Sequence, residues 1–193
     1  MNLDEYAVIR TGLVLSRKEA QPGENCQIYP ALSLKNITEE GQVLLTEIEN
    51  YSAVEQLKEE YFTREGDVLL RLSASYTAVI ITKKECGLLV PSHFAIIRGK
   101  KMIDPRYLRW WLANKRKWFY KIASGGTMMG TISSGYVAQM PFEPPSLEKQ
   151  RRIGEMFELL DRERQLLSSL AVKKKQLINK VLINFVNDKG DVI

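Results

Sequence analysis

The chain has very few of the residues that build metal centres and disulfide networks. Its 193 residues include one histidine, His93, and two cysteines, Cys26 and Cys86. A single histidine excludes a His-Glu-x-x-His zinc site, and two cysteines cannot by themselves supply four ligands to a structural zinc ion. Two cysteines also cannot form the disulfide framework of a small secreted domain. We therefore expect no metal site, and a cytoplasmic protein with reduced thiols.

Long apolar segments are also missing. Apolar runs such as residues 88–90 fall far below the roughly 20 residues that a membrane-spanning helix needs. The first five residues do not begin a signal peptide, because no basic stretch precedes an apolar one. Hydrophobic residues still make up 45% of the chain and charged residues 26%, which is typical of a globular protein. We expect no membrane association.

The sequence contains no recognisable catalytic motif. A Gly-x-Ser-x-Gly elbow is absent, so His93 has no nucleophile of that kind beside it. No acidic residue has a lysine two positions later, as Glu-x-Lys nuclease motifs require. Residues 124–127 are glycine-rich but lack the Gly-Lys-Ser/Thr of a phosphate-binding loop, and residues 143–146 lack the amide and the aromatic residue of the amino-methyltransferase motif. The chain is predicted to bind rather than to catalyse, and to hold no cofactor of its own.

Residues 1 to about 145 have the pattern of a mixed domain with small sheets. Short β-branched and aromatic runs between turn residues predict strands, which we place at residues 7–10, 27–32, 68–72, 76–82 and 93–97. Residues 52–57 have weak helical character. Asp104 followed by Pro105 is a typical helix start, and this helix is expected to reach about Tyr120. Roughly helical spacing relates the apolar residues Leu108, Trp111, Leu112, Phe119 and Ile122.

The second part of the chain is predicted to be one long helix from Leu147 to about Val186. Ser146 can cap its start, and only one glycine and no proline interrupt it. About 38 residues would span about 57 Å at 1.5 Å per residue. An apolar series steps along it by three, four or seven residues, interrupted by Glu163 and Lys174. The series is Ile153, Met156, Leu160, Leu167, Leu170, Leu177 and Val181. Because the chain has no second long helix to cover this stripe, we expect a homodimer through the same helix of another copy.

Basic residues are concentrated between Arg98 and Lys121. This segment contains nine lysines and arginines and only one acidic residue, in a chain whose net charge is +5. The nine are Arg98, Lys100, Lys101, Arg106, Arg109, Lys115, Arg116, Lys117 and Lys121. Such a cluster is either a phosphate-binding surface or a solvated helix face. The interleaved aromatic residues are interpreted as core, since Trp111 and Phe119 lie on the apolar stripe.

Two loops could approach DNA closely. Residues 124–131 combine glycines with hydroxyl side chains, which let backbone N–H groups reach a phosphate or a base, although a plain loop has the same composition. Residues 71–76 are rich in hydrogen-bond donors and lie between two predicted strands, so they form either a base-reading loop or an ordinary connection. His93 is interpreted as a structural hydrogen-bonding residue, with a DNA contact as the alternative.

Together, these features resemble the DNA specificity subunits of type I restriction–modification systems. The clearest similarity is the segment 144–153, Pro-Pro-Ser-Leu-Glu-Lys-Gln-Arg-Arg-Ile, followed by Leu-Leu-Asp at 159–161. In that family a Pro-Pro-Leu-x-Glu-Gln-x-x-Ile-like stretch ends a target recognition domain and opens a long helix; Lys149 departs from it. Three looser similarities are Ala7–Gly12, Arg64–Leu69 and the Gly-Gly-Thr-Met at 125–128.

The resemblance implies a fold and a set of partners. It implies an α+β target recognition domain at residues 1–145, a long coiled-coil-type dimerisation helix at 146–187 and a tail at 188–193. Subunits of this family are non-catalytic: they bind double-stranded DNA and direct an adenine methyltransferase subunit, which uses S-adenosylmethionine, and in full systems an endonuclease and translocase subunit. Full subunits carry two recognition domains and two antiparallel helices. This chain has one of each, so a homodimer would read a split palindrome.

The sequence yields candidate DNA-binding residues and one rival interpretation. The candidates are the donors and cations of the two loops and the basic cluster: Arg71, Ser73, Ser75, Tyr76, Lys83, Lys84, Lys115, Lys117, Ser124, Thr127 and Thr131. The alternative function is a coiled-coil scaffold that recruits protein partners and has little affinity for DNA.

Overall fold

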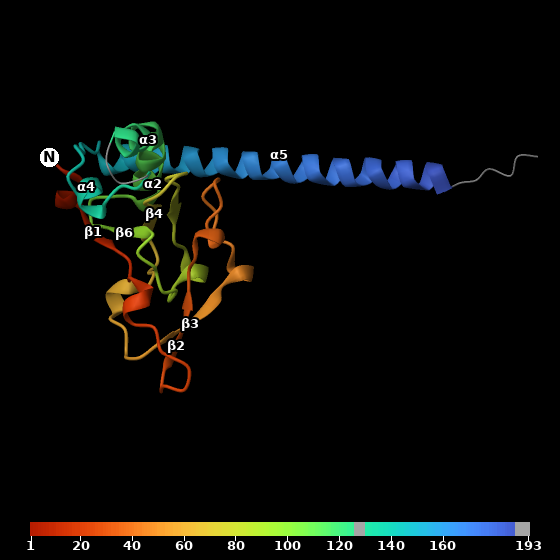
Figure 1. The fold of residues 1–193 in the computed structure, drawn as a ribbon. Coiled ribbons are helices and arrows are strands. Elements are labelled where there is room, and N and C mark those ends of the chain that lie inside the picture. Colours follow the sequence, from red (N-terminus) through yellow and green to blue (C-terminus); the bar gives the residue numbers. More distant parts are fainter. Residues whose placement is uncertain (126–129, 188–193) are drawn as a thin grey trace, which may run out of the picture. The chain divides into compact units, whose positions relative to one another are not determined.

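The computed structural model describes residues 1–125 and 130–187 of the chain (Figure 1). These residues fall into two compact units, of which the first is Met1–Glu155 and the second begins at Met156. The first unit holds all the strands and the first turns of the long helix. Strands and helices are both well represented, which confirms the predicted α+β class.

A four-stranded antiparallel sheet forms the centre of the first unit. Its order is β1-β6-β4-β5, with β1 at Ala7–Thr11, β6 at Phe94–Gly99, β4 at Val68–Arg71 and β5 at Ala78–Ile80. Four of the predicted strands are thus confirmed at nearly the expected places. Side chains alternate between the two faces of a strand, so Val68 and Leu70 enter one core and Leu69 enters another. Both faces of the sheet are therefore buried.

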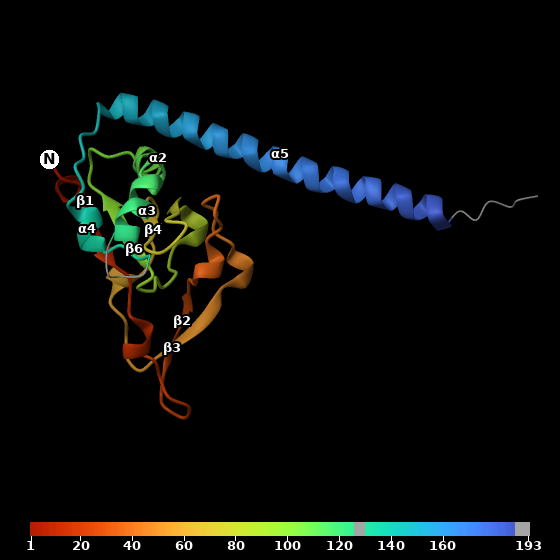
Figure 2. The same cartoon turned by 45° about the horizontal axis from the view of Figure 1, so that its top comes forward.

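A separate two-stranded sheet lies at one end of the unit, away from the helices (Figure 2). It pairs β2, Gln27–Ala31, with β3, Glu49–Ala53. The expected helical character of residues 52–57 is wrong, because Ser52 and Ala53 belong to β3. Burial alternates along this strand, with Tyr51 and Ala53 in a third core cluster, and the cross-strand pairing to β2 outweighs the local helix tendency.

Two consecutive helices cover one face of the central sheet. These are α2, Pro105–Asn114, and α3, Arg116–Gly125. The predicted helix start is confirmed, since the Asp104 side chain accepts a hydrogen bond from the backbone N–H of Arg106 at 2.8 Å. The prediction of one helix to Tyr120 is wrong. The backbone N–H of Lys115 bonds to the carbonyl of Leu112 at 3.0 Å, which tightens the last turn and ends α2.

Short helical turns complete the unit. The two short α-helices are α1, Leu3–Tyr6, and α4, Ser134–Ala138. The 3-10 turns are η1 (Leu15–Arg17), η2 (Leu34–Asn36), η3 (Leu45–Glu47), η4 (Glu59–Tyr61) and η5 (Lys83–Glu85).

The long helix α5 runs over 41 residues, Leu147–Asn187, which confirms the predicted helix. Its start is part of the first unit. The buried side chain of Gln150 accepts from the backbone N–H of Asp104 at 3.0 Å and donates to the carbonyls of Met102 and Pro145 at 3.1 and 2.9 Å. Gly154 follows one turn later, where an added Cβ would lie 2.6 Å from Cβ of Arg106. No helix in the described part of the chain could span a membrane.

Gly12 allows two segments of the first unit to meet at the end of β1. Its N–H donates to the carbonyl of Phe94 at 3.0 Å. A Cβ at this position would come closer than 3.0 Å to the carbonyl oxygens of Val90 and Pro91. The backbones can approach this closely only because the residue lacks a side chain.

We predict that Gly12→Ala lowers the free energy of unfolding by about 2 kcal/mol or more, because backbone must shift to admit the methyl group. The measurement is urea denaturation of the purified protein. Gly135→Ala is the matched control: it lies in α4, its nearest neighbour would be 3.9 Å away, and alanine favours helix. Equal stability of the Gly12→Ala and Gly135→Ala proteins would contradict this account.

Candidate nucleic-acid interface

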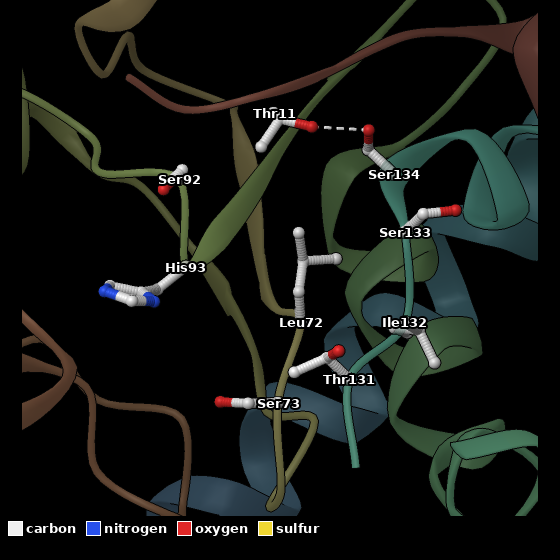
Figure 3. A pocket seen from close by; sticks show the side chains of 9 residues that line it. All are labelled: Thr11, Leu72, Ser73, Ser92, His93, Thr131, Ile132, Ser133 and Ser134. Atoms are coloured by element: carbon white, nitrogen blue, oxygen red, sulfur yellow. Dashed lines mark hydrogen bonds between the residues drawn. The ribbon is translucent and has the colours of Figure 1, made fainter. Parts of the chain in front are cut away.

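A pocket in the first unit gathers hydroxyl side chains from four separate segments (Figure 3). The segments are the end of β1, the residues after β4, the residues before β6 and the approach to α4. The lining residues are Thr11, Leu72, Ser73, Ser92, His93, Thr131, Ile132, Ser133 and Ser134. Six of these nine carry a hydroxyl group, and none is an acid, a lysine or an arginine. Hydroxyl and imidazole groups both donate and accept hydrogen bonds, as base edges require.

Backbone hydrogen bonds hold the four segments of the pocket together. The N–H of Leu72 donates to the carbonyl of His93 at 2.9 Å, and the N–H of Ile132 donates to the carbonyl of Leu72 at 2.8 Å. Ser73 and Thr131 form an isolated antiparallel bridge. The hydroxyls of Thr11 and Ser134 lie 2.6 Å apart (Figure 3). The pocket wall is therefore fixed by backbone pairing, and its six hydroxyl-bearing residues are half-buried or exposed.

A strained turn lies directly beside the pocket. Ser75 and Tyr76 have φ angles of 77° and 39°, a left-handed conformation that costs energy for residues other than glycine. The N–H of Ser75 donates to the Tyr120 hydroxyl at 3.1 Å, and the Tyr76 hydroxyl donates to the carbonyl of Gly130 at 2.6 Å. Burial, with a contribution from neighbouring Tyr120, raises the pKa of the Tyr76 phenol, which keeps this donor protonated. These contacts hold the turn that presents Ser73 to the pocket.

Not all the sequence-derived candidates lie on this surface. Ser73 and Thr131 line the pocket, and Arg71 donates through Nε to the Ser73 hydroxyl at 3.3 Å. Ser75 and Tyr76, by contrast, are 7% and 1% exposed, so their side chains support the turn and cannot reach a base in this structure.

The remaining candidates are exposed or lie elsewhere. Lys83 and Lys84 are exposed on η5 and do not line the pocket. Ser124 is exposed at the end of α3, where its hydroxyl donates to the carbonyl of Lys121 at 2.9 Å. Thr127, with the predicted loop 125–128 around it, lies at 126–129, outside the residues that the structure describes.

Three arginines of the basic cluster are structural. Arg98 binds the buried carboxylate of Asp67 through two hydrogen bonds of 2.7 Å. Arg106 pairs with Asp104 at 2.9 Å. Arg109 is only 8% exposed and donates to the carbonyls of Ala78 and Glu40. The basic cluster seen in the sequence is therefore not a single surface, because these cations stabilise the fold.

Burial of the Asp104 carboxyl by itself would raise its pKa. The side-chain and backbone hydrogen bonds from Arg106 and its charge outweigh that effect, so the pKa of Asp104 lies below its usual value. Asp104 therefore stays ionised and keeps both its capping contact and its ion pair at neutral pH.

The exposed lysines of α3 remain available for phosphates. Lys117 and Lys121 are exposed and are four residues apart, which places them on the same face of the helix. Lys115 lies at the start of this helix with its ammonium 5.3 Å from the centre of the Trp111 ring. The same helix contacts the strained turn through Tyr120. A basic helix face thus adjoins the wall of the uncharged pocket.

Acidic side chains are concentrated in a different part of the unit. Between residues 19 and 65 nine glutamates are exposed: Glu19, Glu24, Glu39, Glu40, Glu47, Glu49, Glu55, Glu59 and Glu65. This acidic part includes β2 and β3, and DNA phosphates are repelled by it. The exposed glutamates of this segment are therefore separate from the pocket lining and from α3, neither of which contains an acidic residue.

Sequence reasoning missed most of the pocket. His93 was interpreted as a structural residue, with a DNA contact as the alternative; its side chain is exposed at the pocket, and no hydrogen bond joins its ring to another described residue. Ser92, Ser133 and Ser134 were not candidates. The run Thr131-Ile132-Ser133-Ser134 was the one signal available, and it has the composition of an ordinary loop.

Metal-binding geometry is not present in the described residues. No group of three or more histidine, cysteine, aspartate or glutamate residues within 1–125 and 130–187 is placed to hold a metal ion. Cys26 and Cys86 are free and exposed.

Comparison with known families assigns the chain. The model of the Type I restriction modification DNA specificity domain matches residues 1–183, and the chain belongs to this family. This confirms the resemblance found in the sequence. The family is defined by DNA specificity and not by a catalytic step, which confirms the prediction of a non-catalytic recognition chain. No curated protein matches the chain.

Solved structures of type I restriction–modification proteins have a similar fold. A chain from a study of complex assembly and conformational transition of the type I system matches 97% of this chain, with 15% identity and a TM-score of 0.68. The HsdS subunit from Thermoanaerobacter tengcongensis matches 100% of it, with 15% identity and a TM-score of 0.64. The S subunit from M. genitalium matches 93%, with 16% identity and a TM-score of 0.55. This chain spans only 44%, 45% and 44% of those chains, respectively.

Proposed function

We propose that the first unit reads one half of a split DNA target in a type I restriction–modification system. The observation that carries this proposal is the uncharged hydroxyl pocket beside the exposed lysines of α3. Lysines contact phosphates of any sequence and set the register of the protein on the duplex, whereas hydroxyl and imidazole groups distinguish base edges. In this proposal Ser73, His93 and Thr131 read bases, and Lys115, Lys117 and Lys121 bind the backbone.

We further propose that two copies act together through α5. From Met156 onward this helix exposes large apolar side chains, including Leu167 at 58% and Leu170 at 61%. Exposed apolar surface on this scale is unfavourable in water and is typical of an interaction face. Of the predicted dimerisation residues, Ile153 packs on the core of the first unit, so it does not belong to this face. The proposed face consists of Met156, Leu160, Leu167, Leu170, Leu177 and Val181.

The catalytic steps in this proposal belong to partner subunits. An adenine methyltransferase subunit would bind S-adenosylmethionine and modify the target that the dimer selects. In a full system an endonuclease and translocase subunit would join the same complex. Such a complex acts on DNA in the cytoplasm.

Measurements of DNA binding should distinguish the phosphate contacts from the base contacts. Lys117→Ala with Lys121→Ala is expected to weaken binding to all duplexes and to reduce the log–log salt slope by up to about two, because each lost phosphate contact releases one counterion fewer. His93→Ala is expected to leave this slope unchanged and to reduce the preference for the target over random DNA. Fluorescence anisotropy across a salt series measures both quantities.

A matched control for the charge change is Lys35→Ala with Lys58→Ala, which removes the same two charges from the acidic part of the unit. An equal loss of slope in this control variant would show that net charge alone drives binding. That result would refute the proposed interface at α3.

Light scattering should give twice the chain mass of 22.1 kDa for the purified protein. Leu167→Glu with Leu170→Glu is expected to give monomers, because burying one unpaired charge costs on the order of several kcal/mol. Ser168→Glu with Ser169→Glu adds the same charges to the same turn at positions flanking the stripe, and the dimer should persist. A monomeric parent protein at tens of micromolar would reject the dimer.

A further inference from the structure

The apolar stripe of α5 follows a regular seam of eight positions. These positions alternate in steps of four and three residues, as in coiled coils that pack knobs into holes. They are Met156, Leu160, Glu163, Leu167, Leu170, Lys174, Leu177 and Val181. The six apolar members are 41–71% exposed. The two charged members interrupt the stripe, and each needs a partner if the seam is buried.

The seam is symmetric about the point between Ser168 and Ser169. Each position has a counterpart at the same distance on the other side of this point. The four pairs are Met156 with Val181, Leu160 with Leu177, Glu163 with Lys174, and Leu167 with Leu170. Three pairs are therefore apolar with apolar, and the fourth joins opposite charges. A sequence with this symmetry is complementary to itself when one copy is reversed.

We propose that the antiparallel α5 dimer adopts the register that places Glu163 opposite Lys174 of the partner subunit. This inference rests on the proposed function, which requires a dimer. Antiparallel helices are the arrangement of full-length subunits that the resemblance implies, and the register is what the seam adds. The paired midpoints define a two-fold axis, so the charge pair occurs twice in the dimer.

Other pairings of the same helices are less favourable. In a parallel dimer in register, Glu163 would face Glu163 of the partner subunit, and Lys174 would face the partner's Lys174. Like charges in a coiled-coil interface select against that arrangement. Moving the antiparallel pair by seven residues would place Glu163 opposite Leu167 or Val181 and would bury a charge without a partner. Only the symmetric register pairs every member of the seam.

Flanking residues have the same symmetry. Leu159 and Ile178 are also equally distant from the midpoint, and they are 69% and 48% exposed. They widen the apolar face at corresponding places on both copies. The symmetry ends at Ile153, which already packs in the first unit. The complementary surface thus extends from Met156 to Val181, and further apolar side chains, Leu182, Ile183, Phe185 and Val186, are exposed beyond it.

Disulfide cross-linking tests the orientation. The background is Cys26→Ser with Cys86→Ser, which removes both native thiols. Leu160→Cys and Leu177→Cys are each introduced alone. In the proposed dimer the two copies of position 160 are 17 residues apart along the helix, about 25 Å at 1.5 Å per residue, whereas disulfide Cα atoms lie roughly 4.4–6.8 Å apart. Neither variant alone should cross-link under mild oxidation, and an equal mixture of the two should.

Charge reversal tests the register. Glu163→Lys or Lys174→Glu alone would place like charges opposite each other twice, and each should weaken dimerisation at least roughly tenfold. The double variant Glu163→Lys with Lys174→Glu restores opposite charges and should recover the parent dissociation constant. Lys175→Glu is the control, because it makes the same change beside the seam and should leave the constant unchanged. Sedimentation equilibrium measures the dissociation constant of each of these four variants.

The outcomes separate this inference from the proposed function. A dimer that cross-links through Leu160→Cys alone would keep the proposed function and overturn the antiparallel pairing. Single reversals without effect on a dimeric protein would overturn the Glu163–Lys174 register. A parent protein that remains monomeric would reject both the dimer and this inference.

Discussion

One buried side chain, that of Gln150, connects the recognition elements to the long helix. Its amide oxygen accepts a hydrogen bond from the N–H of Asp104, and its amide nitrogen donates to the carbonyls of Met102 and Pro145. Removing the amide would leave these buried backbone groups unpaired, at a cost of about 1–3 kcal/mol for each group. Asp104 in turn caps α2, which leads directly into α3 with its exposed lysines. The start of α5 and the start of α2 therefore share one hydrogen-bond network, and Gly154 lets the two helices approach closely.

Charge in the first unit is divided between structural and functional tasks. Arg98 and Arg106 neutralise the carboxylates of Asp67 and Asp104, and this pairing keeps them from phosphates. In the proposed interface the lysines of α3 would attract DNA phosphates, and the glutamates around β2 and β3 would repel them. The pocket between β1, β4, β6 and α4 is uncharged, so its contacts depend on hydrogen-bond geometry rather than on net attraction. A protein arranged in this way can bind any duplex weakly and prefer one sequence through a few hydroxyl and imidazole groups.

The sequence predicted the elements whose signals are local. Asp104 with Pro105 marked the start of α2. The absence of proline and the apolar steps of three, four or seven residues from Ile153 onward predicted α5. Strand β3 was missed because Ser52 and Ala53 are stabilised by pairing with β2, which lies more than 20 residues earlier. The pocket was mostly missed because four distant segments assemble it and serine has no distinctive pattern. The number of basic residues available on one surface was overestimated, because Arg98 pairs with an aspartate 31 positions away in the sequence.

We propose that identical copies of this chain each read one half of a DNA target. Two copies related by a two-fold axis must read the same sequence in opposite orientations, and paired helices of fixed length keep the gap between the halves constant. The most direct measurement is a map of adenine methylation in cells that carry this gene and its modification partner. The account predicts a split palindrome with a constant gap. An asymmetric bipartite motif that needs only this chain for specificity would contradict it.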